Sequence, residues 1–141
     1  MLATIVEAAQ NFCVHQIRSN FQLQNGASKK RTLIAYIDVN AREGKKYRTY
    51  VACDENFTQR VSTLFLEEDE SDEGTLIDMT LETANLIVGS AKVIAEGSTN
   101  AFTINTPHFE KIGLFDFEYD QAKTLIVGSD ELTIAIKELN G

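Results

Sequence analysis

The side chains best suited to a working surface lie in residues 78–96, a stretch that is predicted to form a helix. At 100° per residue, one side of this helix presents an arc of about 80° that contains Glu82, Asn85, Gly89 and Lys92. The carboxylate and the amide offer hydrogen bonds and one negative charge. Asparagine is a weak helix former, and a mid-helix glycine costs about 1 kcal/mol relative to alanine. Their presence on the exposed side indicates the close approach of a partner, with an ordinary solvated face as the alternative.

Other chemistries are poorly represented in the sequence. Neither His15 nor His108 has a carboxylate, cysteine or second histidine at ligand spacing. The chain has no Gly-x-Ser-x-Gly elbow and no glycine-rich phosphate loop. The acidic stretch from Asp69 half-matches a calcium loop, but its twelfth position is Thr80, which cannot supply a bidentate carboxylate. We therefore expect no metal site and a solvated acidic loop at 67–73.

The opposite side of the 78–96 helix is apolar and should face a core. Its apolar residues recur at helical spacing: Leu81, Ala84, Ile87, Val88, Ala91, Ile94 and Ala95. Asp78 or Thr80 can accept a hydrogen bond from the free N–H groups of the first turn, which predicts a start near one of them. Gly97 is a suitable stop.

Two further helices are predicted from the same spacing. Residues 2–19 carry an apolar stripe that includes Cys13, which is most simply a core residue. Residues 57–66 place four apolar residues on one side: Phe57, Val61, Leu64 and Phe65.

The remaining runs are rich in β-branched and aromatic residues and predict strands. Residues 32–39 and 47–52 should form a hairpin, and four short strands are expected at 101–105, 113–119, 123–127 and 131–137. The pentapeptide Leu-Ile-Val-Gly-Ser occurs at 86–90 within the helix and at 125–129, where its Gly-Ser predicts a turn. A helix followed by strands occurs over 2–53 and again over 78–138. We therefore predict an α+β fold with three helices packed on a mostly antiparallel sheet and a pseudo-repeat.

Size and charge narrow the possible partners. The chain has 141 residues, of which 43% are hydrophobic, so residues 1–141 are expected to form a single domain. The formal net charge of -8 argues against binding to nucleic acid or to an anionic membrane, and favours protein or small cationic partners. No apolar run approaches the roughly 20 residues that cross a bilayer, and the two cysteines show no disulfide or metal spacing. These features predict a cytoplasmic protein.

The sequence resembles one known family in the region of the polar stripe. The run from Asp78 to Lys92 resembles the Glu-x-x-Asn helix of the CheC/CheX chemotaxis phosphatases. The segment Ala101–Pro107 and the following Gly113 resemble the strand, proline and glycine that come after that helix in the family. The order of helices and strands is similar to that of CheX, so the resemblance covers most of the chain.

The resemblance implies a function in two-component signalling. Members of this family are protein phosphatases, hydrolases that remove the aspartyl phosphate of the response regulator CheY, and they pair as homodimers through sheet edges. By position, Asn85 would orient the attacking water, and Glu82 would bind a lysine of the regulator. Gly89 and Lys92 would contact the same partner. The chain would need no cofactor of its own, because the Mg²⁺ belongs to the regulator. A neutral amide suits this role, since it does not repel the anionic phosphoryl group.

Two alternatives and one possible second site accompany this interpretation. The same fold can serve as a non-catalytic adaptor that binds a response regulator or a flagellar switch component, or as a structural dimerisation domain. In the first half, Glu7 and Gln10 occupy the place of a second Glu-x-x-Asn pair, with glutamine instead of asparagine. An ordinary surface Glu and Gln is the simpler interpretation of that pair.

Overall fold

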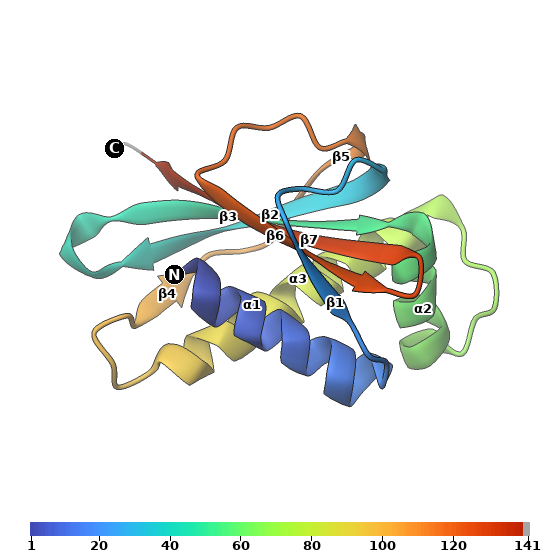
Figure 1. Cartoon of the computed structure of the whole chain (residues 1–141), viewed down its shortest axis with the longest axis horizontal. Coiled ribbons are helices and arrows are strands. Elements are labelled where there is room, and N and C mark those ends of the chain that lie inside the picture. The colour runs from blue at the N-terminus through green and yellow to red at the C-terminus, as the bar shows by residue number, and fades with distance from the viewer. Residues whose placement is uncertain (140–141) are drawn as a thin grey trace.

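The computed structural model describes residues 1–139 as a layer of helices on one sheet (Figure 1). The helical segments are α1 (Leu2–Asn11), a π-helix (Phe12–Ile17), α2 (Glu55–Leu66) and α3 (Glu73–Ala95), with a short 3₁₀ turn at Arg42–Gly44. The strands are β1 (Gln22–Asn25), β2 (Arg31–Ala41), β3 (Lys46–Asp54), β4 (Phe102–Ile104), β5 (His108–Leu114), β6 (Gln121–Val127) and β7 (Asp130–Leu139).

The sheet has seven strands, and every pairing in it is antiparallel. The order is β1-β6-β7-β3-β2-β4, with β5 also paired to β2. When β1, β2 and β3 change places with β5, β6 and β7, the order β1-β6-β7-β3-β2-β5 becomes β5-β2-β3-β7-β6-β1, which is the same order in reverse. The strands of the two halves therefore occupy equivalent positions in the sheet. The predicted α+β fold is therefore confirmed, and the predicted pseudo-repeat has a topological basis.

The main core lies between the sheet and the helices, where α1 and α3 lie side by side (Figure 1). Ile5, Ile37, Ile87 and Ile134 come from four different elements and have no exposed surface. Each such side chain contributes about 1.5–3 kcal/mol by leaving water. Cys13 is fully buried as predicted, and this burial raises the pKa of its thiol to about 11.

The opposite face of the sheet is covered by residues 115–120, which arch over it between β5 and β6 (Figure 1). Tyr50 on β3 stacks on Phe117 at 5.0 Å between ring centroids and meets Phe115 edge-on at 5.2 Å. The predicted strand at 113–119 was therefore wrong. The strand lies earlier, at His108–Leu114, because the aromatic side chains that follow it fold over the sheet.

The hairpin of β2 and β3 and the turn at residues 128–129 are confirmed. The start of α3 differs from the prediction. The helix begins at Glu73, where the Asp72 carboxylate accepts a hydrogen bond from the backbone N–H of Thr75 at 2.8 Å, and not near residue 78 or 80. Strand β1 was not predicted, because all four of its side chains are exposed and it lacks an apolar face. In residues 1–139, no helix is long and apolar enough to cross a membrane.

Candidate functional site

Glu82 and Asn85 lie exposed on α3, as predicted. Within residues 1–139, neither side chain makes a hydrogen bond or an ion pair with another residue, although their neighbours Thr80 and Thr83 do. The two groups are three residues apart, so they project from adjacent positions on the helix surface. Both side chains are thus free for an external partner.

The buried side of α3 holds this pair in place. Ala84, Ile87, Val88 and Ala91 have no exposed surface. The hydroxyls of Thr80 and Thr83 are also buried, and they donate to the carbonyls of Leu76 and Met79 at 2.9 and 2.7 Å. The burial of this side from Leu76 to Ala95 provides a rigid base for the exposed pair.

Three burial predictions on α3 need correction. Leu81 is only half-buried and Ile94 is 40% exposed, although both were expected in the core. The core stripe is narrower than the predicted arc, and in the last turn only the small Ala91 and Ala95 face the core. Lys92 was expected to be exposed and is half-buried.

Gly89 lies one turn beyond Asn85 and is not required by packing within the fold. A Cβ placed on it would meet no atom within 4 Å. The described part of the chain also gives Lys92 no ion-pair partner. Both residues therefore remain available to a partner that contacts this face.

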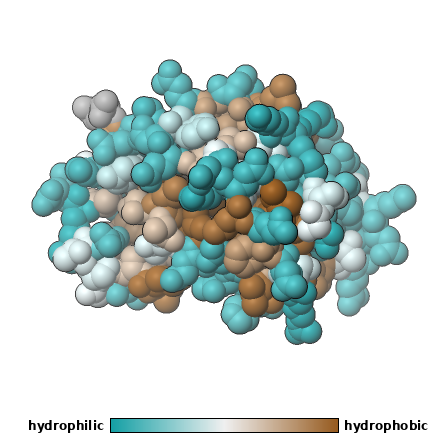
Figure 2. Space-filling model, in the orientation of Figure 1, coloured by the Kyte–Doolittle hydropathy of each residue, from teal (hydrophilic) through white to brown (hydrophobic). Residues whose placement is uncertain are grey.

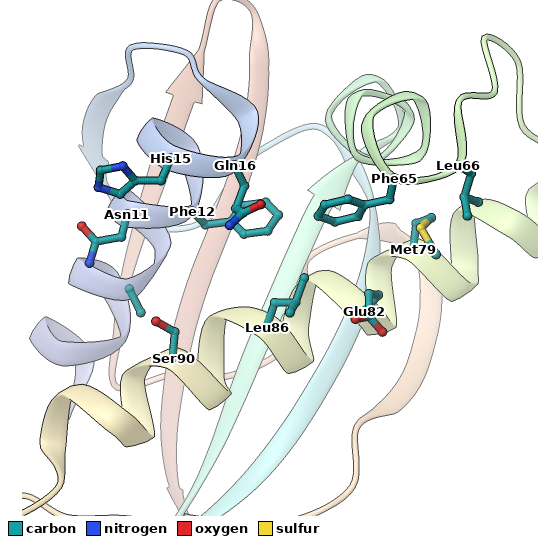
Figure 3. Close-up of a pocket in the computed structure, with 11 residues that line it drawn as sticks. Asn11, Phe12, His15, Gln16, Phe65, Leu66, Met79, Glu82, Leu86 and Ser90 are labelled. Carbon is teal, nitrogen blue, oxygen red and sulfur yellow. The ribbon is translucent and has the colours of Figure 1, made fainter.

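A groove of about 690 Å³ lies beside Glu82, between the end of α1 with the π-helix, the end of α2 and the middle of α3. We call it the α3 groove, and its apolar lining consists of Phe12, Phe65, Leu66, Met79 and Leu86. Figure 3 shows Phe12 and Phe65 pointing toward one another, with Leu86 and Glu82 on α3.

The groove was not predicted from the sequence, which indicated only that Leu64 and Phe65 share one side of the helix with Phe57 and Val61. Phe57 and Val61 are fully buried, whereas Leu64 and Phe65 are 45% and 38% exposed. Leu64, Phe65 and Leu66 follow one another directly, and three consecutive helical residues cannot all face the same core. That run was the available signal.

The wall of the groove opposite α3 is partly a π-helix, which continues α1 for six residues. It ends at Arg18 in the left-handed region, with φ of 60°. Wider π-helical turns are uncommon and occur often at functional sites. Here the turn places the buried Phe12 and the exposed His15 and Gln16 along the groove.

The acidic connection, residues 67–72, joins α2 to α3 and begins directly after Leu66, which lines the groove. It lacks helix and strand, as predicted, but α2 fixes it in place. Gln59 accepts from the backbone N–H of Ser71 at 2.9 Å, and the hydroxyl of Thr63 donates to the carbonyl of Glu68 at 2.8 Å. Within residues 1–139, none of its carboxylates pairs with a lysine or arginine.

The pair Glu7 and Gln10 lies on α1, and it does not join the pair on α3. Glu7 is exposed and Gln10 is half-buried. Both line a separate groove of about 670 Å³ at the β1 side of the sheet, together with Asn25 and Lys123. The structure therefore keeps the two pairs in different surroundings.

The two histidines are far from forming a metal centre. His108 stacks on Tyr36 at 5.2 Å between ring centroids, whereas His15 lies at the α3 groove. Across residues 1–139, no group of three or more His, Cys, Asp or Glu side chains is placed to hold a metal ion.

Comparison with known proteins finds matches among solved structures, and none among family models or curated sequences. No protein-family model matches the chain, and the sequence matches no curated protein. The fold matches the chemotaxis protein CheX from Vibrio vulnificus with a TM-score of 0.79 at 16% identity, over 96% of this chain and 97% of that one. It matches CheX in the CheX-CheY-BeF₃-Mg²⁺ complex from Borrelia burgdorferi with a TM-score of 0.70 at 14% identity, over 96% and 97%.

A more distant match is FliY from Thermotoga maritima, with a TM-score of 0.57 at 15% identity, over 95% of this chain and 83% of that one. At these identities the comparisons show the fold. The chain has the fold of CheX and CheC-like proteins, as the resemblance in sequence implied.

Proposed function

We propose that this chain is a CheX-like phosphatase that hydrolyses the aspartyl phosphate of a CheY-type response regulator in chemotaxis signalling. The observation that carries the proposal is the exposed, internally unbonded pair Glu82 and Asn85 on the buried helix α3 of a CheX-like fold. A solved CheX of this fold was captured with CheY, BeF₃ and Mg²⁺, which supports a regulator as the partner.

In the proposed mechanism, Asn85 acts on the attacking water. Its amide holds a water molecule in line with the phosphorus atom of the regulator's aspartyl phosphate. The water oxygen bonds to phosphorus as the bond to the aspartate oxygen breaks, which regenerates the carboxylate of the regulator's aspartate and releases inorganic phosphate that keeps the protons of the water. Positioning and charge stabilisation account for most of the catalysis of phosphoryl transfer, so one well-held amide suffices.

Glu82 anchors the regulator in this proposal. Its carboxylate accepts from a lysine at the regulator's active site and so aligns the phosphoryl group with Asn85. Gly89 leaves room for the partner's backbone, and Lys92 contacts the same partner. The magnesium ion belongs to the regulator, and the chain contributes no cofactor.

The decisive experiment measures the decay of phosphorylated regulators. Each CheY-type regulator of the source organism is phosphorylated and incubated with the chain, and the remaining phosphoprotein is followed over time. We expect at least one regulator to lose its phosphate faster with the wild-type chain than alone. Binding of a regulator without faster decay would instead support the adaptor function, and no binding at all would support a structural dimerisation domain.

We also propose that residues 1–141 form one cytoplasmic domain that pairs as a homodimer through a sheet edge. Strand β1 forms one edge of the sheet, and β4 and β5 lie at the other, beyond β2. Unpaired edge strands present free N–H and C=O groups to a second strand. Sedimentation should give twice the 15.7 kDa mass of the chain at micromolar concentration, and a mass near 15.7 kDa would contradict the dimer.

A further inference from the structure

We propose that the α3 groove receives apolar side chains of the response regulator, and that the acidic connection beside it selects a regulator with basic residues around that apolar patch. This inference rests on the proposed function and extends it. It assigns a specificity surface to side chains outside the Glu82 and Asn85 pair.

The first argument is the unusual exposure of apolar side chains at the groove. Phe65, Leu66 and Leu86 are 38%, 42% and 38% exposed, yet they come from two helices and line a single hollow. Hydrophilic side chains predominate on the face drawn in Figure 2, with apolar patches among them. Contiguous apolar surface that is rimmed by polar residues is typical of a protein-binding site.

The second argument is continuity with the proposed catalytic pair. Glu82 lines the groove and is also the proposed anchor for the regulator (Figure 3). Around the helix axis, Asn85 lies about 60° to one side of Glu82, and Leu86 lies about 40° to the other side, where the groove is. A regulator that contacts both Asn85 and Glu82 therefore reaches the edge of the groove.

The third argument is charge. Glu67, Asp69 and Glu70 are exposed in the connection that begins directly after the groove residue Leu66, and none pairs with a lysine or arginine of residues 1–139. Basic groups on the partner would complement these carboxylates and speed its association. A second copy of the chain is a poor occupant, because it would bring an equally acidic rim against this one.

The test compares groove variants with a matched control on the same helix. Phe65→Ala and Leu86→Ala remove groove side chains, whereas Val93→Ala removes an apolar side chain that is 65% exposed on α3 outside the groove. The probes are the CheY-type regulators of the source organism, each activated with beryllofluoride and Mg²⁺. The readouts are the Kd for each regulator, the dephosphorylation rate at a saturating concentration of the chain, and circular dichroism as a check on folding.

We expect each groove variant to raise the Kd about tenfold, as truncation of an anchoring hot-spot side chain does. Turnover at saturation should change less than twofold, and Val93→Ala should behave as wild type. The double variant Glu67→Gln, Glu70→Gln should raise the Kd less and weaken its dependence on salt.

Three results would overturn the inference. If both groove variants bind as tightly as wild type while Asn85→Ala abolishes turnover, the groove assignment fails and the proposed function stands. If the wild-type chain neither binds nor dephosphorylates any regulator, both fail. If the groove variants dissociate a dimer and leave regulator binding unchanged, the groove is an interface between copies.

Discussion

Helices α1 and α3 occupy matching places in the two halves of the fold, but only α3 presents an exposed carboxylate and amide three residues apart. Glu82 and Asn85 are both exposed, whereas on α1 Glu7 is exposed and Gln10 is half-buried. The α3 helix is regular over 23 residues, and α1 is regular over only 10 before it widens into the π-helix.

The difference shows that α1, although it occupies the place of α3 in its half of the fold, does not present an equivalent polar pair. The end of the α1 segment forms a wall of the α3 groove, while its own polar pair faces the β1 side of the sheet. One helix therefore presents the polar pair and the other shapes its surroundings. Four predictions test this division.

The largest effect is expected from Asn85→Ala. Turnover of phosphorylated regulator should fall about 100-fold, because removal of one positioned hydrogen-bonding group commonly has an effect of this size. Binding should change little, since the amide acts mainly in the transition state. The measurement is the decay of phosphorylated regulator, alongside the Kd for the beryllofluoride-activated form. Wild-type turnover in a folded variant would refute the mechanism and favour the adaptor function.

Glu82→Ala should weaken regulator binding. The Kd should rise about tenfold if the contact of Glu82 with the regulator is desolvated, and by less if the contact is exposed to solvent. The fold should be unaffected, because Glu82 makes no hydrogen bond or ion pair with the described residues. Titration of the activated regulator measures this effect, and thermal unfolding provides the control. An unchanged Kd would remove Glu82 from the contact.

Gly89→Ala should have opposite effects on folding and binding. The added Cβ meets nothing within 4 Å, so the free energy of unfolding should rise by about 1 kcal/mol through helix propensity. Regulator binding should fall by a few fold if the partner's backbone lies against the glycine. Denaturant unfolding and titration measure the two effects. A variant that is more stable and binds normally would show that the glycine plays no part in recognition.

The smallest effect is expected from α1. Gln10→Ala should leave both turnover and binding unchanged. Gln10→Asn, which completes the Glu-x-x-Asn spacing, should not restore turnover to Asn85→Ala, because its surroundings include Asn25 and Lys123 in place of the α3 groove. The same decay assay measures both variants. Restored turnover would mean that α1 carries a second working site.

Local sequence patterns were sufficient to predict the exposed pair and much of the frame around it. The apolar spacing in 78–96 predicted that Glu82 and Asn85 would face solvent, and both do. The two copies of Leu-Ile-Val-Gly-Ser were assigned correctly to a helix and to a strand with its turn, because their neighbours carry different periods. Such patterns are local, since they depend on which side chains alternate within one helix or strand.

Tertiary structure decided the order of the strands, the place of residues 115–120 over the sheet and the exposure of Phe65. Each of these depends on elements far apart in the chain, and apolar side chains do not reveal by their spacing which distant surface covers them. Phe65 shares the apolar side of its helix with the buried Phe57, but α2 ends where no element of the described chain covers Phe65 fully. The sequence alone thus determined which residues face outward on α3, and only the packing of α1, α2 and α3 produced the groove beside them.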